Sequence, residues 1–174
     1  MKFSIVACIN QNLVLGDGDD LIYHIKSDLK NFRRITDGSI VVCGRKTYES
    51  FPKRPLPNRV NIVLTRDENY KAEGAIIVHS ILELIELGRD FPTDAEVFVI
   101  GGGQIYKEFL DKGLVDTMYL TMVHDNKNGN VLFPINPLED KDWKIFYQSC
   151  PQVDGEFTYD FTIFKKSKLI NFGN

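Results

Sequence analysis

Short runs of apolar residues alternate with amphipathic segments along most of the chain. The runs are nearly continuous rather than strictly alternating, which is typical of strands buried on both faces of a largely parallel sheet. We expect such strands at residues 3–9, 39–43, 60–64, 75–78, 97–100 and 117–123, and helices at residues 27–36, 46–50, 80–87 and 104–112. Strands alternating with helices predict an α/β fold, in which helices flank a mostly parallel central β-sheet.

The C-terminal part of the chain has a different pattern. Residues 144–149 and 157–165 alternate between apolar and polar positions and flank a turn that contains Asp154-Gly155. This pattern predicts an antiparallel hairpin at one edge of the sheet. We expect residues 1–166 to form a single domain and residues 167–174 to form a C-terminal tail.

Two loops are long enough to have a function of their own. Residues 10–24 are rich in Gly and Asp, and residues 53–59 read KRPLPNR. The first follows the N-terminal strand, and the second precedes the strand at 60–64. Both are therefore candidates for parts of a binding site.

Composition restricts the class of partner. The chain has 174 residues, 43% of them hydrophobic, and a formal net charge of -3. This charge argues against nucleic acid as a partner, so any anionic ligand must meet a local cluster of basic residues. Cys8, Cys43 and Cys150 have no zinc-site spacing, and we expect free thiols in a cytoplasmic protein without a metal. We expect neither a signal peptide nor a membrane span.

Three consecutive glycines mark a junction between a strand and a helix. Residues 99–106 read VIGGGQIY, in which Gly101, Gly102 and Gly103 let the backbone approach a ligand and leave the first N–H groups of the helix free. Tyr106 stands where the last glycine of the G-x-G-x-x-G fingerprint would fall, so the motif differs from that fingerprint. The turn suits a phosphate or pyrophosphate, and a tight structural turn remains the alternative.

Basic residues follow two of the expected strands. Arg45 and Lys46 come directly after the strand that ends at Gly44, and Arg66 follows the next strand after Thr65. Cations at a helix N-terminus oppose the helix dipole unless an anion is bound there. An Arg in place of the usual acid at a nucleotide-binding strand end accommodates a 2′-phosphate. The pattern favours NADP over NAD, and solvated surface cations are the alternative.

One acid and one cation are further candidates. Asp28 lies on or beside the apolar face of the helix at 27–36, where a carboxylate is either functional or firmly paired. The alternative places Ser27 at the N-cap and Asp28 as an ordinary first-turn acid. Arg59 ends the Pro-rich loop and could grip a carboxylate, or it could be a surface residue. Thr121 lies in an apolar strand, where we expect its hydroxyl to be bonded internally.

These motifs together resemble the dihydrofolate reductase family, in the family's order and from about residue 3 to 166. The matching segments read IVACINQNLVLGDGDDLIY, SDLKNF, VVCGRKTYESF, RPLPNR, NIVLTR, VIGGGQIY, MYLT and GNVLFP. Each segment alone is a weak signal, but their occurrence in register is specific. The resemblance implies an oxidoreductase that uses NADPH to reduce dihydrofolate for one-carbon metabolism, with methotrexate or trimethoprim as competitors. It also implies a monomer.

The resemblance implies roles for individual residues. Asp28 would bind the 2-amino group and N3 of the pterin, supported by Thr121, and Arg59 would hold the glutamate α-carboxylate. Tyr23 and Tyr106 would also belong to the catalytic set. The substrate site would comprise Val6, Cys8, Asp28, Leu29, Phe32, Phe51, Leu56, Arg59, Ile100 and Thr121.

The cofactor site implied by the resemblance lies along the strand ends and the first loop. It would comprise Cys8, Leu15, Gly16, Gly44, Arg45, Lys46, Thr47, Leu64, Thr65, Arg66, His79, Gly101, Gly102, Gly103, Gln104, Ile105 and Tyr106. Family members have a cis peptide bond between the first two glycines, here Gly101–Gly102. In the implied reaction a hydride reaches C6 of the pterin. Asp28 is too far from N5 to protonate it directly, so water would carry the proton.

The chain departs from the family pattern at the end of the first loop. Leu21-Ile22-Tyr23 replaces the usual Leu-Pro-Trp or Met-Pro-Trp, and the Tyr hydroxyl does not reproduce the indole N–H that positions a water near the carboxylate in the family. Asn130 stands where many bacterial members have an Asp that contacts this loop, and Lys53 is an insertion. Two alternatives follow: the related reductase of riboflavin biosynthesis, and a folate-binding protein without turnover.

Overall fold

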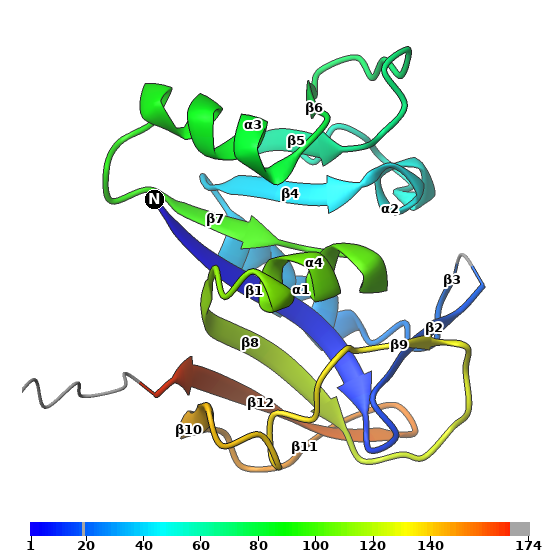
Figure 1. Ribbon diagram of the computed structural model, residues 1–174. Helices are drawn as coiled ribbons and strands as arrows, with labels where there is room; N and C mark the ends of the chain where they lie inside the picture. Colours follow the sequence, from blue (N-terminus) through cyan, green and yellow to red (C-terminus); the bar gives the residue numbers. More distant parts are fainter. Residues whose placement is uncertain (19, 168–174) are drawn as a thin grey trace, which may run out of the picture.

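The computed structural model describes residues 1–18 and 20–167. Its main sheet has nine strands in the order β10-β12-β8-β1-β7-β4-β5-β6, with β11 paired to β12 (Figure 1). The central strands pair in parallel and fall on the predicted apolar runs. Their bounds are β1 Lys2–Asn10, β4 Ile40–Gly44, β5 Val60–Leu64, β6 Ile76–Val78, β7 Glu96–Val99 and β8 Val115–Val123. The predicted α/β class with a mostly parallel sheet is confirmed.

Helices cover both faces of this sheet. They are α1 Lys26–Thr36, α2 Arg45–Ser50, α3 Ile81–Leu87 and α4 Gly103–Asp111, with a 3₁₀ turn η1 Gly88–Asp90 after α3. Leu84 of α3 and Phe109 of α4 pack in one hydrophobic cluster, and Tyr48 of α2 and Phe32 of α1 pack in another. Figure 1 shows α3 and α4 in front of the sheet and α1 behind it.

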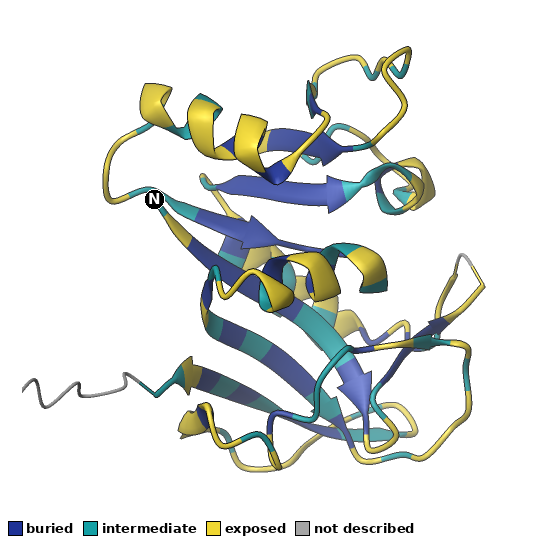
Figure 2. Cartoon of the chain, viewed as in Figure 1, coloured by how far each residue is buried: buried dark blue, intermediate teal, exposed yellow. Residues whose placement is uncertain are grey.

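Burial on both faces explains why the strand sequences do not alternate. Val41 and Val42 are neighbours in β4, are 1% and 0% exposed, and belong to opposite clusters. The central strands are therefore dark along most of their length in Figure 2, whereas the helices are exposed on their outer faces. Every position in such a strand can bury an apolar side chain, which gives the continuous runs.

The C-terminal strands form the predicted antiparallel edge, with one difference in the turn. They are β10 Trp143–Gln148, β11 Gln152–Asp154 and β12 Phe157–Lys166, and β12 pairs antiparallel with β8. The Asp154-Gly155 turn joins β12 to the short β11, while β10 pairs with the other end of β12. Ser167 donates its N–H to the carbonyl of Asp142. The rest of the expected tail lies outside the described residues.

The loop expected at residues 10–24 contains strands that the sequence did not predict. β2 Val14–Asp17 pairs antiparallel with β3 Asp20–Leu21 and with β9 Val131–Leu132, which makes a separate three-stranded sheet. The segment expected as a loop therefore includes two short strands that the apolar pattern did not indicate. Among the described residues, no helix is long and apolar enough to cross a membrane.

Candidate functional site

The carboxyl ends of the parallel strands meet along one edge of the sheet. The N–H of Gly44, at the end of β4, donates to the carbonyl of Gly101, after β7, at 2.8 Å. The N–H of Thr65, after β5, donates to the carbonyl of Val78, at the end of β6, at 3.0 Å. This edge therefore brings together the strand-end residues that the sequence singled out separately.

A carboxylate and a hydroxyl meet beside this edge. Asp28 lies in the first turn of α1, and the buried Thr121 of β8 donates its hydroxyl to Oδ1 of Asp28 at 2.5 Å. Burial raises the pKa of Asp28 above its ordinary value, and the hydrogen bond from Thr121 offsets part of that effect. Burial also raises the pKa of the Cys8 thiol, and the charge of Asp28 adds to the increase.

The start of α1 differs from the alternative that made Ser27 the N-cap. Ile25 holds that position and no side chain of the cap residue bonds the helix. The N–H of Ser27 instead donates to Oδ2 of Asp154, the last residue of β11, at 2.9 Å. No local sequence signal connects these two residues, so the contact was missed.

Apolar and aromatic side chains from several elements pack together with Phe32 of α1. Phe32, Phe51 and Leu56 are partly buried against the same cluster that holds Val6 and Ile100. They come from α1, from the end of α2, from the Pro-rich loop, from β1 and from the residue that follows β7, so the fold brings them together at one place. Leu29 is 50% exposed at the start of this face.

The Pro-rich loop holds a guanidinium beside that apolar group. Arg59 donates through Nη1 to the hydroxyl of Thr36 and through Nε to the carbonyl of Pro57, each at 2.9 Å. Its guanidinium carbon lies 5.8 Å from the ring centre of Phe32. Partial burial lowers the pKa of Arg59, the carboxylate of Asp37 raises it, and the charge of Arg33 lowers it. Two cations lie here beside one acid, so the charge at this place remains positive and suits a carboxylate.

Asn61 shapes this loop and was not singled out from the sequence. It is 4% exposed, accepts the N–H of Leu56 through Oδ1, and donates to the carbonyls of Leu56 and Arg59. A polar residue inside the apolar strand VNIVL was the available signal. A buried amide in such a run must find partners, and here it finds them in the loop.

The glycine turn closes tightly against α2. The Gly101–Gly102 peptide bond is cis, as the resemblance implies, and Gly101 has a φ of 118°. A Cβ on Gly102 would lie 3.2 Å from the hydroxyl of Thr47, and one on Gly44 would lie 3.1 Å from Cγ1 of Ile105. A side chain at Gly102 would therefore crowd Thr47 and the space in front of the helix N-terminus.

Two helix N-termini open onto this edge without acids. In α2 and α4 the N-cap residues are Gly44 and Gly102, and within these described helices neither makes a side-chain cap bond nor has an acid in the first turn. α3 is the contrast, because Ser80 accepts the N–H of Glu83 and this acid lies in the first turn. Uncapped N–H groups and the positive end of the dipole suit an anion, so these residues fit the pyrophosphate of a dinucleotide.

Cations flank the same edge. Arg45 pairs with Glu49 at 3.3 Å on the surface of α2, and Lys46 and Arg66 are exposed close to the strand ends. His79 contacts the carbonyl of Thr65 through Nδ1 at 3.0 Å. Leu64 is buried in β5, and Gln104 is exposed in the first turn of α4.

The segment after β1 is tied to the segment before β9. The N–H of Gly18 donates to Oδ1 of Asn130 at 2.8 Å, so the amide makes the loop contact expected at this position. Leu15 is buried and packs with the main core. A Cβ on Gly16 would lie 2.3 Å from the carbonyl oxygen of Asp20, so only glycine fits at this position of β2.

The hydroxyls of the two candidate catalytic tyrosines bond to groups other than Asp28. Tyr23 donates to Oδ2 of Asp125 at 2.8 Å and accepts from Nδ2 of Asn10 at 3.0 Å. Tyr106 donates to the carbonyl of Val6 at 2.8 Å, beneath the glycine turn. Burial raises the pKa of both phenols, that of Tyr23 to about 12. Both hydroxyls therefore stay protonated and act as hydrogen-bond donors.

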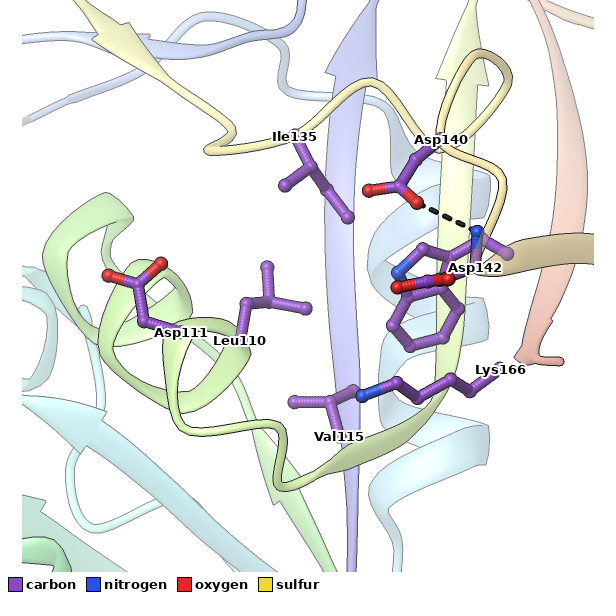
Figure 3. Close-up of a pocket in the computed structure, with 8 residues that line it drawn as sticks. Leu110, Asp111, Val115, Ile135, Asp140, Asp142 and Lys166 are labelled. Atoms are coloured by element: carbon purple, nitrogen blue, oxygen red, sulfur yellow. Dashed lines mark hydrogen bonds between the residues drawn. The ribbon is translucent and has the colours of Figure 1, made fainter. Parts of the chain in front are cut away.

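A separate pocket of about 120 Å³ lies at the opposite end of the parallel strands (Figure 3). Val115, at the start of β8, lines it, and Asp140 accepts the N–H of Asp142 at its rim at 2.9 Å. The pocket contains none of the candidate site residues. Among the described residues, no group of His, Cys, Asp or Glu is arranged to hold a metal ion.

A partly buried carboxylate, a guanidinium beside the ring of Phe32 and two helix N-termini without side-chain caps are features expected of a nucleotide-dependent α/β enzyme. Comparison with known proteins supports this class. A family model described as Dihydrofolate reductase matches residues 2–168. A dihydrofolate reductase of Staphylococcus aureus is 37% identical over 145 residues, 83% of this chain and 84% of the relative. One of Haemophilus influenzae is 36% identical over 160 residues, 92% and 94% of the two chains.

A solved structure gives the same result. A dihydrofolate reductase from Enterococcus faecalis, complexed with NADP(H) and RAB-propyl, matches with a TM-score of 0.83 at 28% identity and covers 95% of this chain and 96% of its own. The chain belongs to the dihydrofolate reductase family.

Proposed function

We propose that this chain reduces 7,8-dihydrofolate to 5,6,7,8-tetrahydrofolate with NADPH. The observation that carries the proposal is the partly buried Asp28 carboxylate bonded to Thr121 beside an apolar, aromatic wall. A carboxylate in this setting can accept two parallel N–H bonds from the 2-amino group and N3 of a pterin. Family membership and the NADP(H) complex of the Enterococcus faecalis enzyme support the same choice.

Different residues bind different parts of the substrate. Asp28 and Thr121 orient the pterin, Phe32, Phe51 and Leu56 enclose the ring and the p-aminobenzoyl group, and the Arg59 guanidinium receives the glutamate α-carboxylate. This last role is supported by the bonds from Arg59 to Thr36 and Pro57, which fix the guanidinium before substrate arrives. Methotrexate and trimethoprim are expected to compete at the same place.

The cofactor binds along the carboxyl ends of the parallel strands. The uncapped N-termini of α2 and α4 receive phosphate oxygens, and Arg45, Lys46, Thr65 and Arg66 receive the phosphates of the adenosine end. NADPH, when bound, supplies a hydride for C6 of the pterin. The protein contributes alignment and exclusion of water. Asp28 binds the edge of the ring away from N5, so it orients and polarises the pterin while water delivers the proton. We further propose that the chain works as a monomer in the cytoplasm.

The test is loss of absorbance at 340 nm on mixing the purified protein with NADPH and dihydrofolate. We expect turnover by the parent chain and a loss of about a hundredfold or more in kcat/KM for Asp28→Asn, because the amide presents one acceptor and no charge. Asp116→Asn, at an exposed position of β8, is the matched control and should keep parental rates.

Other outcomes separate the alternatives. Turnover of a ribosylated aminopyrimidine phosphate but not of dihydrofolate would identify the riboflavin-pathway reductase instead. Tight methotrexate binding without oxidation of NADPH would identify a folate-binding protein without turnover. An active Asp28→Asn variant would remove the carboxylate from the mechanism.

A further inference from the structure

The first turn of α1 is capped by a residue from the other end of the chain. Oδ2 of Asp154 accepts both the backbone N–H of Ser27, at 2.9 Å, and its hydroxyl, at 2.7 Å. The hydroxyl of Tyr159, on β12, donates to Oγ of Ser27 at 2.6 Å. The cap residue of the helix itself is Ile25, whose side chain has no acceptor. Asp154 therefore does what a Ser or Asp at the N-cap does in other helices.

Ser27 and Asp28 are consecutive, and both are held to the antiparallel edge of the sheet. Ser27 bonds to Asp154 at the end of β11 and to Tyr159 on β12, and Asp28 bonds to Thr121 on β8. β12 and β8 are neighbours, with Tyr159 opposite Val123 and Phe161 opposite Thr121. Two adjacent points of the helix are thus fixed to one rigid ladder, which sets where the Asp28 carboxylate lies.

The charge of Asp154 is also suited to this place. A carboxylate near a helix N-terminus interacts favourably with the helix dipole. The hydrogen bonds from Ser27 lower the pKa of Asp154, so it is ionised at neutral pH. Both the hydrogen bonds and the negative charge of Asp154 therefore favour its position at the N-terminus of α1.

We propose that Asp154 is a positioning residue for substrate binding, which holds the first turn of α1 so that Asp28 meets the pterin. The inference rests on the proposed function, because it concerns the same carboxylate. It assigns no contact between Asp154 and substrate. The effect passes through Ser27 and reaches Asp28, and the cofactor edge lies on other elements.

The experiment compares Asp154→Ala, Asp154→Asn and Val153→Ala. We expect Asp154→Ala to raise the KM for dihydrofolate and the Kd for methotrexate about fivefold. This is the change in an equilibrium constant that corresponds to the stability usually lost with a helix cap. The KM for NADPH should stay at the parental value. Asp154→Asn keeps an acceptor oxygen and should recover most of the loss. Val153 is 72% exposed on the same strand, so Val153→Ala should behave as the parent.

Amide hydrogen exchange of Ser27 in the free protein gives a readout independent of turnover. Faster exchange in Asp154→Ala together with the expected change in KM supports the proposal. Faster exchange with a parental KM and Kd would overturn it, since the cap would then be structural only. Equal rises in both KM values would also overturn it, because they would indicate general loosening.

Failure of the proposed function gives a different result. A parent chain that binds methotrexate without turnover contradicts the reductase, and the Kd comparison between Asp154→Ala and the parent still decides the positioning role. A parent that neither turns over dihydrofolate nor binds methotrexate overturns both.

Discussion

At the scale of single residues, Asp28 is held at a cost in stability. Burial raises its pKa from the ordinary value of 3.8. A carboxyl group whose pKa is higher in the folded than in the unfolded state makes stability fall as pH rises between the two values. Each unit of increase corresponds to about 1.4 kcal/mol. Asp28→Asn removes the charge, so we expect this variant to be more stable than the parent at neutral pH while it loses activity.

The measurement is the difference in Tm between Asp28→Asn and the parent from pH 4 to pH 8. The difference should grow with pH, by about 2–4 °C for each kcal/mol regained. Asp116→Asn should give a difference that does not change in this way. A less stable Asp28→Asn at pH 8 would show that the hydrogen bond from Thr121 outweighs the cost of burial.

Single residues also show where sequence reasoning ended. Asp28 could be singled out because the helical period places it beside Ile25, Leu29 and Phe32. Its partner Thr121 was expected to bond internally, and only the resemblance connected the two. Asp154 was expected only as part of a turn, because its contact with Ser27 spans 127 positions of the chain. Nothing in local pattern indicates which turn will cap which helix.

At the scale of elements, Tyr23 anchors the small β3-β2-β9 sheet to the segment at 124–130. Its hydroxyl donates to Asp125 and accepts from the fully buried Asn10, whose own side chain holds the N–H groups of Asn12 and Val14. Tyr23→Phe removes two hydrogen bonds from a side chain that is 4% exposed. We expect a loss of about 1–3 kcal/mol, seen as a lower urea midpoint, and faster proteolysis within residues 10–24.

The pH dependence distinguishes this anchor from general packing. The hydrogen bond from Tyr23 lowers the pKa of Asp125 below its ordinary value of 3.8. The stability that this bond contributes is therefore present above pH 3.8 and is lost as pH falls through the lowered pKa. The difference in urea midpoint between the parent and Tyr23→Phe should therefore become smaller toward about pH 3. Tyr147→Phe, at a side chain 52% exposed on β10, is the control. A gap that is constant with pH would argue against the phenol–carboxylate bond.

Elements differed in how far the sequence could predict them. The buried parallel strands and α3 carry their signals locally: Ser80 and Glu83 have the spacing of a capping box, Gly88 follows the apolar run, and in the structure α3 is capped at these two ends. β2 and β3 lie in a segment rich in Gly and Asp, and β9 has two residues. Such short strands form because distant segments pair, as Val14 does with Leu132. The expectation of a loop at residues 10–24 therefore did not include them.

At the scale of the whole molecule, charge is separated between the two ends of the parallel strands. The net charge is -3, and the charged residues that line the pocket at the amino end are Asp111, Asp140 and Asp142, with Lys166 as the one cation among these described residues. The carboxyl end carries Arg45, Lys46 and Arg66 beside two uncapped helices. A protein with negative overall charge attracts a dinucleotide phosphate only at such a local cluster.

This separation predicts how the chain distinguishes NADPH from NADH. Arg66→Gln removes a cation next to the place where the 2′-phosphate would lie, so we expect the KM for NADPH to rise about tenfold and the KM for NADH to stay the same. The ratio of the KM for NADPH in Arg66→Gln to that in the parent should become smaller in high salt, because exposed charges are screened beyond a Debye length of about 8 Å at 0.15 M. Arg89→Gln, on η1 at the other end of the sheet, should change neither KM. Equal effects on both cofactors would place Arg66 near the shared pyrophosphate, and no effect on either would leave the preference to Arg45 and Lys46.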